Sequence, residues 1–105
     1  MSDYVIAVTT VSDEEHIERI KGAVIDKKLA VCMNVIPSVV SYYWWKNKVK
    51  KDEEFIILMK TKKSLVEKLK IAVLSNHPYE VAEFIVIPFE DIGSHYRDWI
   101  DGVLG

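Results

Sequence analysis

Runs of apolar and β-branched residues alternate along the chain with segments in which apolar positions recur at helical spacing. The extended runs cover residues 4–11, 30–46, 49–61 and 79–88. β-Branched and aromatic residues of this kind favour strands. The continuous apolar run at residues 55–59 further indicates burial on both faces of its strand. The pattern therefore predicts four strands, of which the second and third are long for a small protein.

Three segments between and after these runs are predicted to form helices. Ser12 with Glu15, and Ser64 with Glu67, have the serine–glutamate spacing of a capping box, which satisfies free amide groups at a helix start. Lysines are expected to close the first helix, and a proline is expected to stop the second. The expected boundaries are Ser12 and Lys28 for the first helix, Ser64 and His77 for the second, and Ser94 for the start of the third.

The order of these elements is β-α-β-β-α-β-α. A split β-α-β unit with an antiparallel hairpin in its middle is the ferredoxin-like arrangement, in which helices cover one face of the sheet. The third helix is an addition to that core. The sequence therefore predicts an α+β protein, with a ferredoxin-like fold, a long central hairpin and an extra C-terminal helix, as one domain over residues 1–105.

The central hairpin is the most unusual feature of the pattern. Its turn is expected at Asn47, because asparagine tolerates the left-handed backbone conformation of tight turns. Pro37 is expected to bend the first arm, because proline donates no hydrogen bond to a ladder. Four consecutive aromatic residues, at 42–45, place large apolar side chains on both faces of the ribbon. A small domain cannot cover them alone, so the hairpin is predicted to contact other copies of the chain.

Composition excludes several classes of partner. The net charge is −2, and the lysines at residues 46–51 are followed at once by the acidic residues 52–54, so no nucleic-acid partner is expected. Cys32 is the only cysteine, which excludes an internal disulfide and fits a reducing compartment. No apolar run approaches the length of a membrane span, and no segment has the pattern of a signal peptide. A cytoplasmic protein without a membrane partner is expected.

Five short motifs resemble those of the CutA family, the divalent cation tolerance proteins. The most extensive, AVCMNVIP at residues 30–37, resembles the family's A-x-C-x-N-x-I-P segment. The resemblance covers nearly the whole chain. It implies a ferredoxin-like protomer that assembles as a homotrimer through long strands, with a role in tolerance of divalent cations, especially copper. The other motifs are YWWKNK at residues 43–48, Lys60-Thr61 with Ser64-Leu65, His77-Pro78-Tyr79-Glu80 with Glu83, and Tyr96 with Trp99.

The chain departs from the family at positions that matter for metal binding. The family's copper ligands, where described, are a cysteine late in the first strand and two adjacent histidines. The matching positions here are Thr9, Asn76 and His77, of which only His77 keeps a strong copper ligand. Ala82 stands where the family usually has proline, so the strand at 79–88 is expected to pair more regularly here.

Each candidate residue has a structural alternative. His77 is the predicted metal ligand, but a histidine that bonds the last carbonyls of a helix is the interpretation ranked first. Cys32 is expected to be a small buried hydrophobe rather than a reactive thiol. Glu83 is expected to share a strand face with Val81 and Ile85 and to find a hydrogen-bond donor. The residues predicted to line a cleft are Cys32, Tyr43, Trp45, Lys60, Glu80 and Glu83, and the predicted trimer contacts are Tyr42, Trp44 and Trp45.

Three functions remain open, and no enzyme is expected. The sequence has no glycine-rich phosphate loop, no G-x-S-x-G and no H-E-x-x-H, so no organic cofactor is predicted. The first function is a trimer that binds a divalent cation such as Cu²⁺. The second is a regulatory or scaffold trimer, similar in fold to the PII signalling proteins, which binds a small ligand or an unidentified protein partner at subunit clefts. The third is a small hydrolase such as an acylphosphatase, but Arg19 and Arg97 both fall on predicted helices instead of an anion-binding loop.

Overall fold

A computed structural model describes residues 3–105 and confirms the predicted order of elements. These residues form a mixed α+β structure with a four-stranded antiparallel sheet, three α-helices and one short 3₁₀ helix. The elements are β1 (Tyr4–Val11), α1 (Glu14–Val24), β2 (Cys32–Trp45), β3 (Lys48–Lys62), η1 (Lys63–Leu65), α2 (Val66–Ser75), β4 (Ile85–Pro88) and α3 (Ser94–Leu104).

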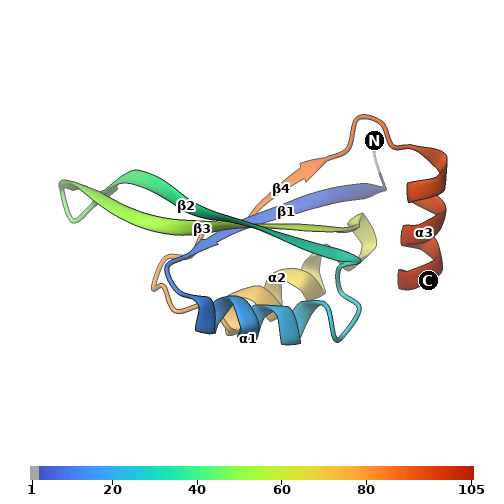
Figure 1. Ribbon diagram of the computed structural model, residues 1–105, viewed down its shortest axis with the longest axis horizontal. Helices are drawn as coiled ribbons and strands as arrows, with labels where there is room; N and C mark the ends of the chain where they lie inside the picture. Colours follow the sequence, from blue (N-terminus) through green and yellow to red (C-terminus); the bar gives the residue numbers. More distant parts are fainter. Residues whose placement is uncertain (1–2) are drawn as a thin grey trace.

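The sheet has the strand order β2-β3-β1-β4, so β2 and β4 are its edges. Helices α1 and α2 lie side by side under one face of the sheet, and the opposite face carries no helix along its length (Figure 1). Helix α3 stands across one end, where Tyr4 Oη donates a hydrogen bond of 2.7 Å to Asp101. The hairpin of β2 and β3 projects beyond the other end, so the molecule is 45 Å long but only 27 and 23 Å across.

The core forms where the alternating side chains of the sheet meet the two helices. In β1, Val5, Ala7, Thr9 and Val11 are buried, whereas the residues between them are half-buried. This period of two is expected for a strand that has one face covered. The fully packed cluster on the helix side comprises Ala7, Val11, Ile20, Val24, Ala30, Ile57, Met59, Leu69 and Val73.

The open face of the sheet is also apolar. Ile6 of β1 is paired with Ile87 of β4, and Val8 is paired with Ile85, so these side chains share the face opposite the helices. Ile85 and Ile87 are each 50% exposed. An apolar sheet face of this kind marks a surface for association. Residues 55–59 were predicted to be buried on both faces. Within one chain Ile57 and Met59 are fully buried, whereas Phe55, Ile56 and Leu58 remain half-buried.

The hairpin turn confirms the prediction at Asn47, which has a φ of 65°, and it also places Lys46 at a φ of 49°. Two successive residues with positive φ form the type of two-residue turn that suits the twist of a hairpin. The bend at Pro37 is a bulge: the pairing changes register between Ile36 and Val39, and Ser38 has a φ of 61°. Two residues of β2 therefore stand opposite one residue of β3 at this point.

The predicted serine caps are wrong. Helix α1 is capped by Asp13, whose carboxylate accepts a hydrogen bond of 2.8 Å from the His16 amide, and the helix ends at Val24 before the expected lysines. A carboxylate, unlike a serine hydroxyl, also carries a negative charge that interacts favourably with the helix dipole at the N-terminus. Neither Ser64 nor Ser94 provides a side-chain cap. Among residues 3–105, no helix is long and apolar enough to cross a membrane.

The fourth strand is shorter than predicted. Only Ile85–Pro88 pairs with β1, whereas residues 79–84 form an irregular segment. The reason is that side chains bind the backbone of this segment: Thr9 Oγ1 donates to the Glu83 carbonyl at 2.6 Å, and the Tyr79 amide donates to His77 Nδ1 at 3.2 Å. The expected strand face shared by Glu83 and Ile85, and the more regular pairing expected from Ala82, are therefore wrong.

Candidate functional site

A cleft of about 550 Å³ lies at the root of the projecting hairpin. Its walls are the end of β1, the outer parts of β2 and β3, and the irregular segment that follows α2. Four of the six residues predicted from the sequence as cleft-lining lie here, namely Tyr43, Trp45, Glu80 and Glu83. The remaining lining residues are Thr10, Ser12, Trp44, Lys50, Asp52, Glu53, Glu54, Tyr79 and Val81.

Glu54 is the carboxylate held most firmly in the cleft. It is only 7% exposed, and Tyr79 Oη donates a hydrogen bond of 2.6 Å to its Oε2 atom. Burial, together with this hydrogen bond to a carboxylate, raises the pKa of Tyr79 to about 12. Tyr79 therefore stays protonated and anchors the irregular segment to the hairpin.

Both ring nitrogens of His77 are occupied by hydrogen bonds. Nδ1 accepts from the Tyr79 amide, so the ring hydrogen is on Nε2, which donates to the Thr10 carbonyl at 2.8 Å and lies 3.1 Å from Thr9 Oγ1. Burial lowers the pKa of His77 and favours this neutral form, although the Thr10 carbonyl partly opposes the change. The ring thus ties the end of α2 to β1. Ligation of a metal by His77 would require the loss of one of these bonds and stays a prediction.

Glu83 lies close enough to Glu54 for the two carboxylates to repel one another. Burial raises the pKa of Glu83, and the negative charge of Glu54 raises it further. Tyr79 donates its hydrogen bond to Glu54 and not to Glu83. Of the described residues that line the cleft, Lys50 is the only basic one. The cleft therefore has an excess of negative charge that a bound cation would relieve.

The aromatic residues of the hairpin divide between its two faces. Tyr43 Oη donates a hydrogen bond to the Asp52 carboxylate, which raises the pKa of Tyr43, and Trp45 is half-buried. By contrast, Tyr42 is 67% and Trp44 74% exposed. Lys51 Nζ lies 5.7 Å from the centre of the Tyr42 ring. Residues 3–105 of one chain leave most of the surface of Tyr42 and Trp44 exposed, as the sequence pattern indicated.

Cys32 and Lys60 lie away from this cleft. They are paired with one another at the opposite end of the β2–β3 ladder, where Lys60 Nζ stands 5.8 Å from the centre of the Tyr96 ring. Cys32 is half-buried, and its Sγ lies 3.5 Å from Asn34 Oδ1. These two residues face the open side of the sheet near α3 and do not join the other four within one chain.

The described residues do not assemble a complete metal site in one copy. Within residues 3–105, no three side chains of histidine, cysteine, aspartate or glutamate are grouped so that they could hold one ion. At the family's other ligand positions, Thr9 bonds a carbonyl and Asn76 donates to the Ala72 carbonyl at 2.8 Å. A metal in the cleft would therefore need ligands from water or from a second copy.

Sequence reasoning missed the role of Glu54. The run Asp52-Glu53-Glu54 has the charge that is typical of a solvent-exposed segment, but Glu54 is buried where the exposed outer part of β3 meets its buried inner part. Its only sequence signal is its position next to the apolar run that begins at Phe55. Its donor, Tyr79, lies 25 residues away, so no local pattern links them.

Comparisons with known proteins agree on one family. The family of CutA1 divalent ion tolerance proteins matches residues 5–103. The chain is 43% identical over 94 residues to human Protein CutA, covering 90% of this chain and 52% of that protein. It is 35% identical over 95 residues to the divalent-cation tolerance protein CutA of Thermus thermophilus, covering 90% of this chain and 92% of that protein.

Solved structures show the same fold. The crystal structure of CutA1 from Oryza sativa has a TM-score of 0.92 and 34% identity, covering 99% of this chain and 95% of that chain. The structure of the divalent cation tolerance protein from Thermus thermophilus has a TM-score of 0.91 and 33% identity, covering 97% and 99%. The chain spans about half the length of several curated relatives: 54% of the rice protein, which is described as chloroplastic, and 55% of the mouse protein.

Proposed function

Because the chain belongs to the CutA1 divalent ion tolerance family, we propose that it works as a homotrimer that binds divalent cations, copper among them. The proposed site is the acidic cleft at the root of the hairpin, completed by a neighbouring copy. The proposal assigns no catalytic activity to the chain.

The observation that carries the proposal is the pair of carboxylates Glu54 and Glu83. Burial raises the pKa of Glu83 and the negative charge of Glu54 raises it further, so the two carboxylates oppose one another in the absence of a cation. Carboxylate oxygen and imidazole nitrogen are ligands that divalent metals accept in proteins. Since residues 3–105 of one copy do not group three such ligands, the trimer supplies what the single chain lacks.

Association of copies is supported by two uncovered surfaces. One is the apolar open face of the sheet, which includes Ile85 and Ile87, and the other is the exposed pair Tyr42 and Trp44 on the hairpin. Burial of apolar surface stabilises assembly by roughly 25 cal/mol per Å². A closed cyclic arrangement would let each hairpin contact the next copy.

Light scattering and calorimetry test the two parts of the proposal separately. The scattering mass is expected to be three times that of one chain, and Trp44→Ala is expected to lower it. A monomeric mass would exclude the trimer. Cu²⁺ titrated into the assembled protein is expected to bind saturably at one site per copy.

Matched substitutions then locate the cation. Glu83→Gln removes one cleft carboxylate and is expected to weaken Cu²⁺ binding about tenfold or more, which corresponds to about 1.4 kcal/mol. Glu18→Gln, on the exposed side of α1, is the control and is expected to bind as the parent does. His77→Gln tests whether imidazole takes part. Equal binding by all variants would place the metal on surface groups outside the cleft and exclude the proposed site.

A regulatory or scaffold trimer that binds a small ligand is the second candidate. Its support is the aromatic lining of the same cleft, where Tyr43 and Trp45 offer apolar surface beside polar groups. The complete use of both nitrogens of His77 in hydrogen bonds also favours it over a histidine-centred metal site. Absence of saturable Cu²⁺ binding, with the trimeric mass retained, would favour this candidate.

A further inference from the structure

The carboxylates of the cleft beside Tyr79 are spread along its walls instead of being grouped around one point. Asp52 and Glu54 are two residues apart in β3, so their side chains leave the same face of the strand about 7 Å apart. In the described range 3–105, no three potential ligands are grouped closely enough to hold one metal ion. This spacing suits two separate positive charges better than one compact ion.

Each of these two carboxylates accepts a hydrogen bond from a tyrosine. Tyr43 Oη donates to Asp52, and Tyr79 Oη donates to Glu54 Oε2 at 2.6 Å. Both tyrosines line the cleft, so an aromatic ring lies beside each carboxylate. A carboxylate binds an ammonium group through charge-assisted hydrogen bonds, and a ring binds it through its π face. The cleft therefore contains two tyrosine–carboxylate pairs, each with both kinds of group that bind an organic cation.

The other residues of the cleft leave this negative charge largely unbalanced. Glu53, Glu80 and Glu83 add three carboxylates, and Lys50 is the only basic residue of the described lining. Lys50 lies opposite Tyr43 in the β2–β3 ladder and therefore shares a face of the hairpin with it. None of the ion pairs formed within residues 3–105 includes Lys50. Its ammonium group is thus a competitor for a cation bound in the cleft.

A small ligand can occupy this cleft in the proposed assembly. Tyr43 and Asp52 lie on one face of the hairpin, because side chains alternate along each strand, whereas Tyr42 and Trp44 alternate to the other face. Tyr42 and Trp44 are the exposed pair proposed to contact the next copy. A volume of about 550 Å³ leaves room for a small molecule beside a wall that the next copy supplies.

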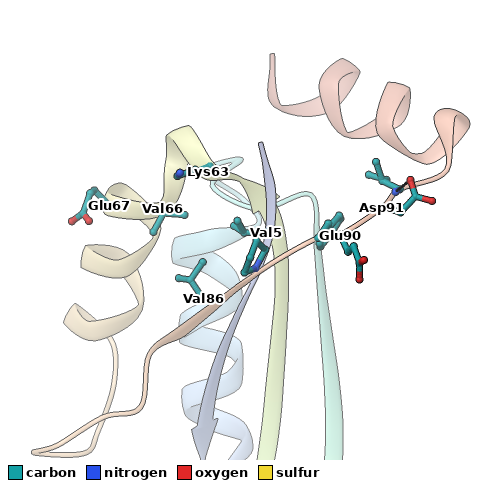
Figure 2. Close-up of a pocket in the computed structure, with 10 residues that line it drawn as sticks. Val5, Lys63, Val66, Glu67, Val86, Glu90 and Asp91 are labelled. Atoms are coloured by element: carbon teal, nitrogen blue, oxygen red, sulfur yellow. Dashed lines mark hydrogen bonds between the residues drawn. The ribbon is translucent and has the colours of Figure 1, made fainter. Parts of the chain in front are cut away.

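The larger groove of the molecule, of about 780 Å³ between β4 and the start of α2, lacks this arrangement. Figure 2 shows the carboxylates of Glu67 and Glu90 directed away from the gap between Val66 and Val86. Glu67 also forms an ion pair of 3.4 Å with Lys70. The described lining of the groove includes no tyrosine. The groove therefore offers apolar surface to a ligand but no tyrosine–carboxylate pair.

We propose that the cleft binds a linear aliphatic diamine, with one ammonium group at each tyrosine–carboxylate pair and the methylene chain between the two rings. This inference names the ligand class of the second candidate function, on which it rests. A diamine with four methylene groups matches the spacing of Asp52 and Glu54, because its extended chain is similar in length to two residues of a strand. Its methylene groups cover apolar ring surface that a hydrated metal ion leaves in contact with water.

The probe is 1,4-diaminobutane, titrated by calorimetry into the full chain in its native assembly at neutral pH and low salt. Butylamine, which has the same carbon chain but one ammonium group, is the control ligand. The diamine is expected to bind saturably at one site per copy, at least about tenfold more tightly than butylamine. Equal binding of the two ligands would overturn the assignment of two ammonium sites, and absence of saturable diamine binding would overturn the proposal.

Substitutions on the hairpin locate the diamine. Asp52→Asn is expected to weaken diamine binding about tenfold, because it removes the charge of one pair. Lys50→Gln removes the competing ammonium group and is expected to strengthen binding about threefold. Glu18→Gln on the exposed side of α1 is the matched control and is expected to bind as the parent does. Unchanged binding by Asp52→Asn, or weaker binding by Lys50→Gln or Glu18→Gln, would overturn the proposal.

The result can be told apart from that of the proposed cation site, because Cu²⁺ is left out of the diamine titrations. Diamine binding without Cu²⁺ binding in the separate titration would support the diamine site and exclude the metal site. Cu²⁺ binding without diamine binding would leave the metal site in place and overturn the inference drawn from the two tyrosine–carboxylate pairs.

Discussion

The two halves of β3 belong to one strand but have opposite surroundings. The inner half lies between β1 and β2, and Ile57, Met59 and Thr61 are completely buried. The outer half pairs with β2 only, and Val49 is 56% exposed. Its cross-strand partners on β2 nevertheless include the four aromatic residues 42–45. The burial of a side chain therefore depends on which element packs over it, and no helix formed by residues 3–105 packs over the outer half.

Glu54 marks the boundary between the two halves. It is the last residue of β3 before the apolar run, and its partner Tyr79 comes from the segment that follows α2. Two hydrogen bonds hold that segment against β1: His77 Nε2 donates to the Thr10 carbonyl, and Thr9 Oγ1 donates to the Glu83 carbonyl. The comparison shows that a polar network closes the core at the point where the apolar packing ends.

The largest effect is expected from the inner half. Ile57→Ala should lower the free energy of unfolding by about 2–5 kcal/mol, because it removes a fully buried side chain and leaves a cavity. Val49→Ala, in the exposed outer half, should change it by about 0.5 kcal/mol or less. Urea unfolding of both variants measures the difference. Equal losses would show that the outer half is as well packed as the inner one.

A smaller effect is expected at the boundary. Tyr79→Phe leaves the buried carboxylate of Glu54 without its donor and should cost about 1–3 kcal/mol. Tyr43→Phe removes a tyrosine–carboxylate hydrogen bond of the same kind, but on the exposed hairpin, and should cost less. Chemical denaturation at neutral pH compares the two. A greater loss for Tyr43→Phe would contradict the role assigned to the boundary.

The boundary should also respond to pH. The folded pKa of His77 is lowered, so the unfolded chain binds its proton first, near the ordinary value of 6.5, and stability falls as the pH decreases through that value. Glu83 has the opposite sign: its folded pKa is raised, so its contribution is lost as the pH rises above the ordinary value of 4.5. The melting temperature should therefore decline from pH 7.5 to about 5.5, and His77→Gln should flatten this decline. An unchanged slope in the variant would assign the effect to other groups.

The smallest effect is expected at the tip. Asn47 has a φ of 65°, which glycine adopts without strain, so Asn47→Gly should alter stability by about 0.5 kcal/mol or less. Asn47→Val should cost about 1–2 kcal/mol, because a β-branched residue disfavours positive φ. Thermal unfolding measures both. Similar values for the two variants would mean that the turn does not constrain the hairpin.

The sequence predicted the parts of the fold that depend on local pattern. The first strand, the aromatic hairpin and the turn at Asn47 are all encoded in neighbouring residues. The helix cap at Asp13 instead of Ser12 could not be chosen by spacing, because both are good capping residues one position apart. The start of the fourth strand was predicted too early, because Thr9, distant in sequence, binds the Glu83 carbonyl and His77 binds the Tyr79 amide.

The candidate site was predicted only in part for the same reason. Tyr43, Trp45, Glu80 and Glu83 meet because the hairpin and the segment after α2 both reach the end of β1. Lys60 lies too far along β3 to join them. The hydrogen bond between Glu54 and Tyr79 depends on how two segments that are distant in sequence pack together. No local sequence pattern predicts that packing.

The bulge at Pro37 and Ser38 separates two independent registers in the hairpin. The turn fixes the pairs from Trp45 and Lys48 back to Val39 and Glu54, and the core fixes those from Ile36 inward. Residues can therefore be added to the outer ribbon in matched pairs, two per strand, without shifting any pair of the inner ladder. Each such addition would extend the ribbon by about 7 Å. The reach of the hairpin is thus adjustable in length, while the core that supports it stays the same.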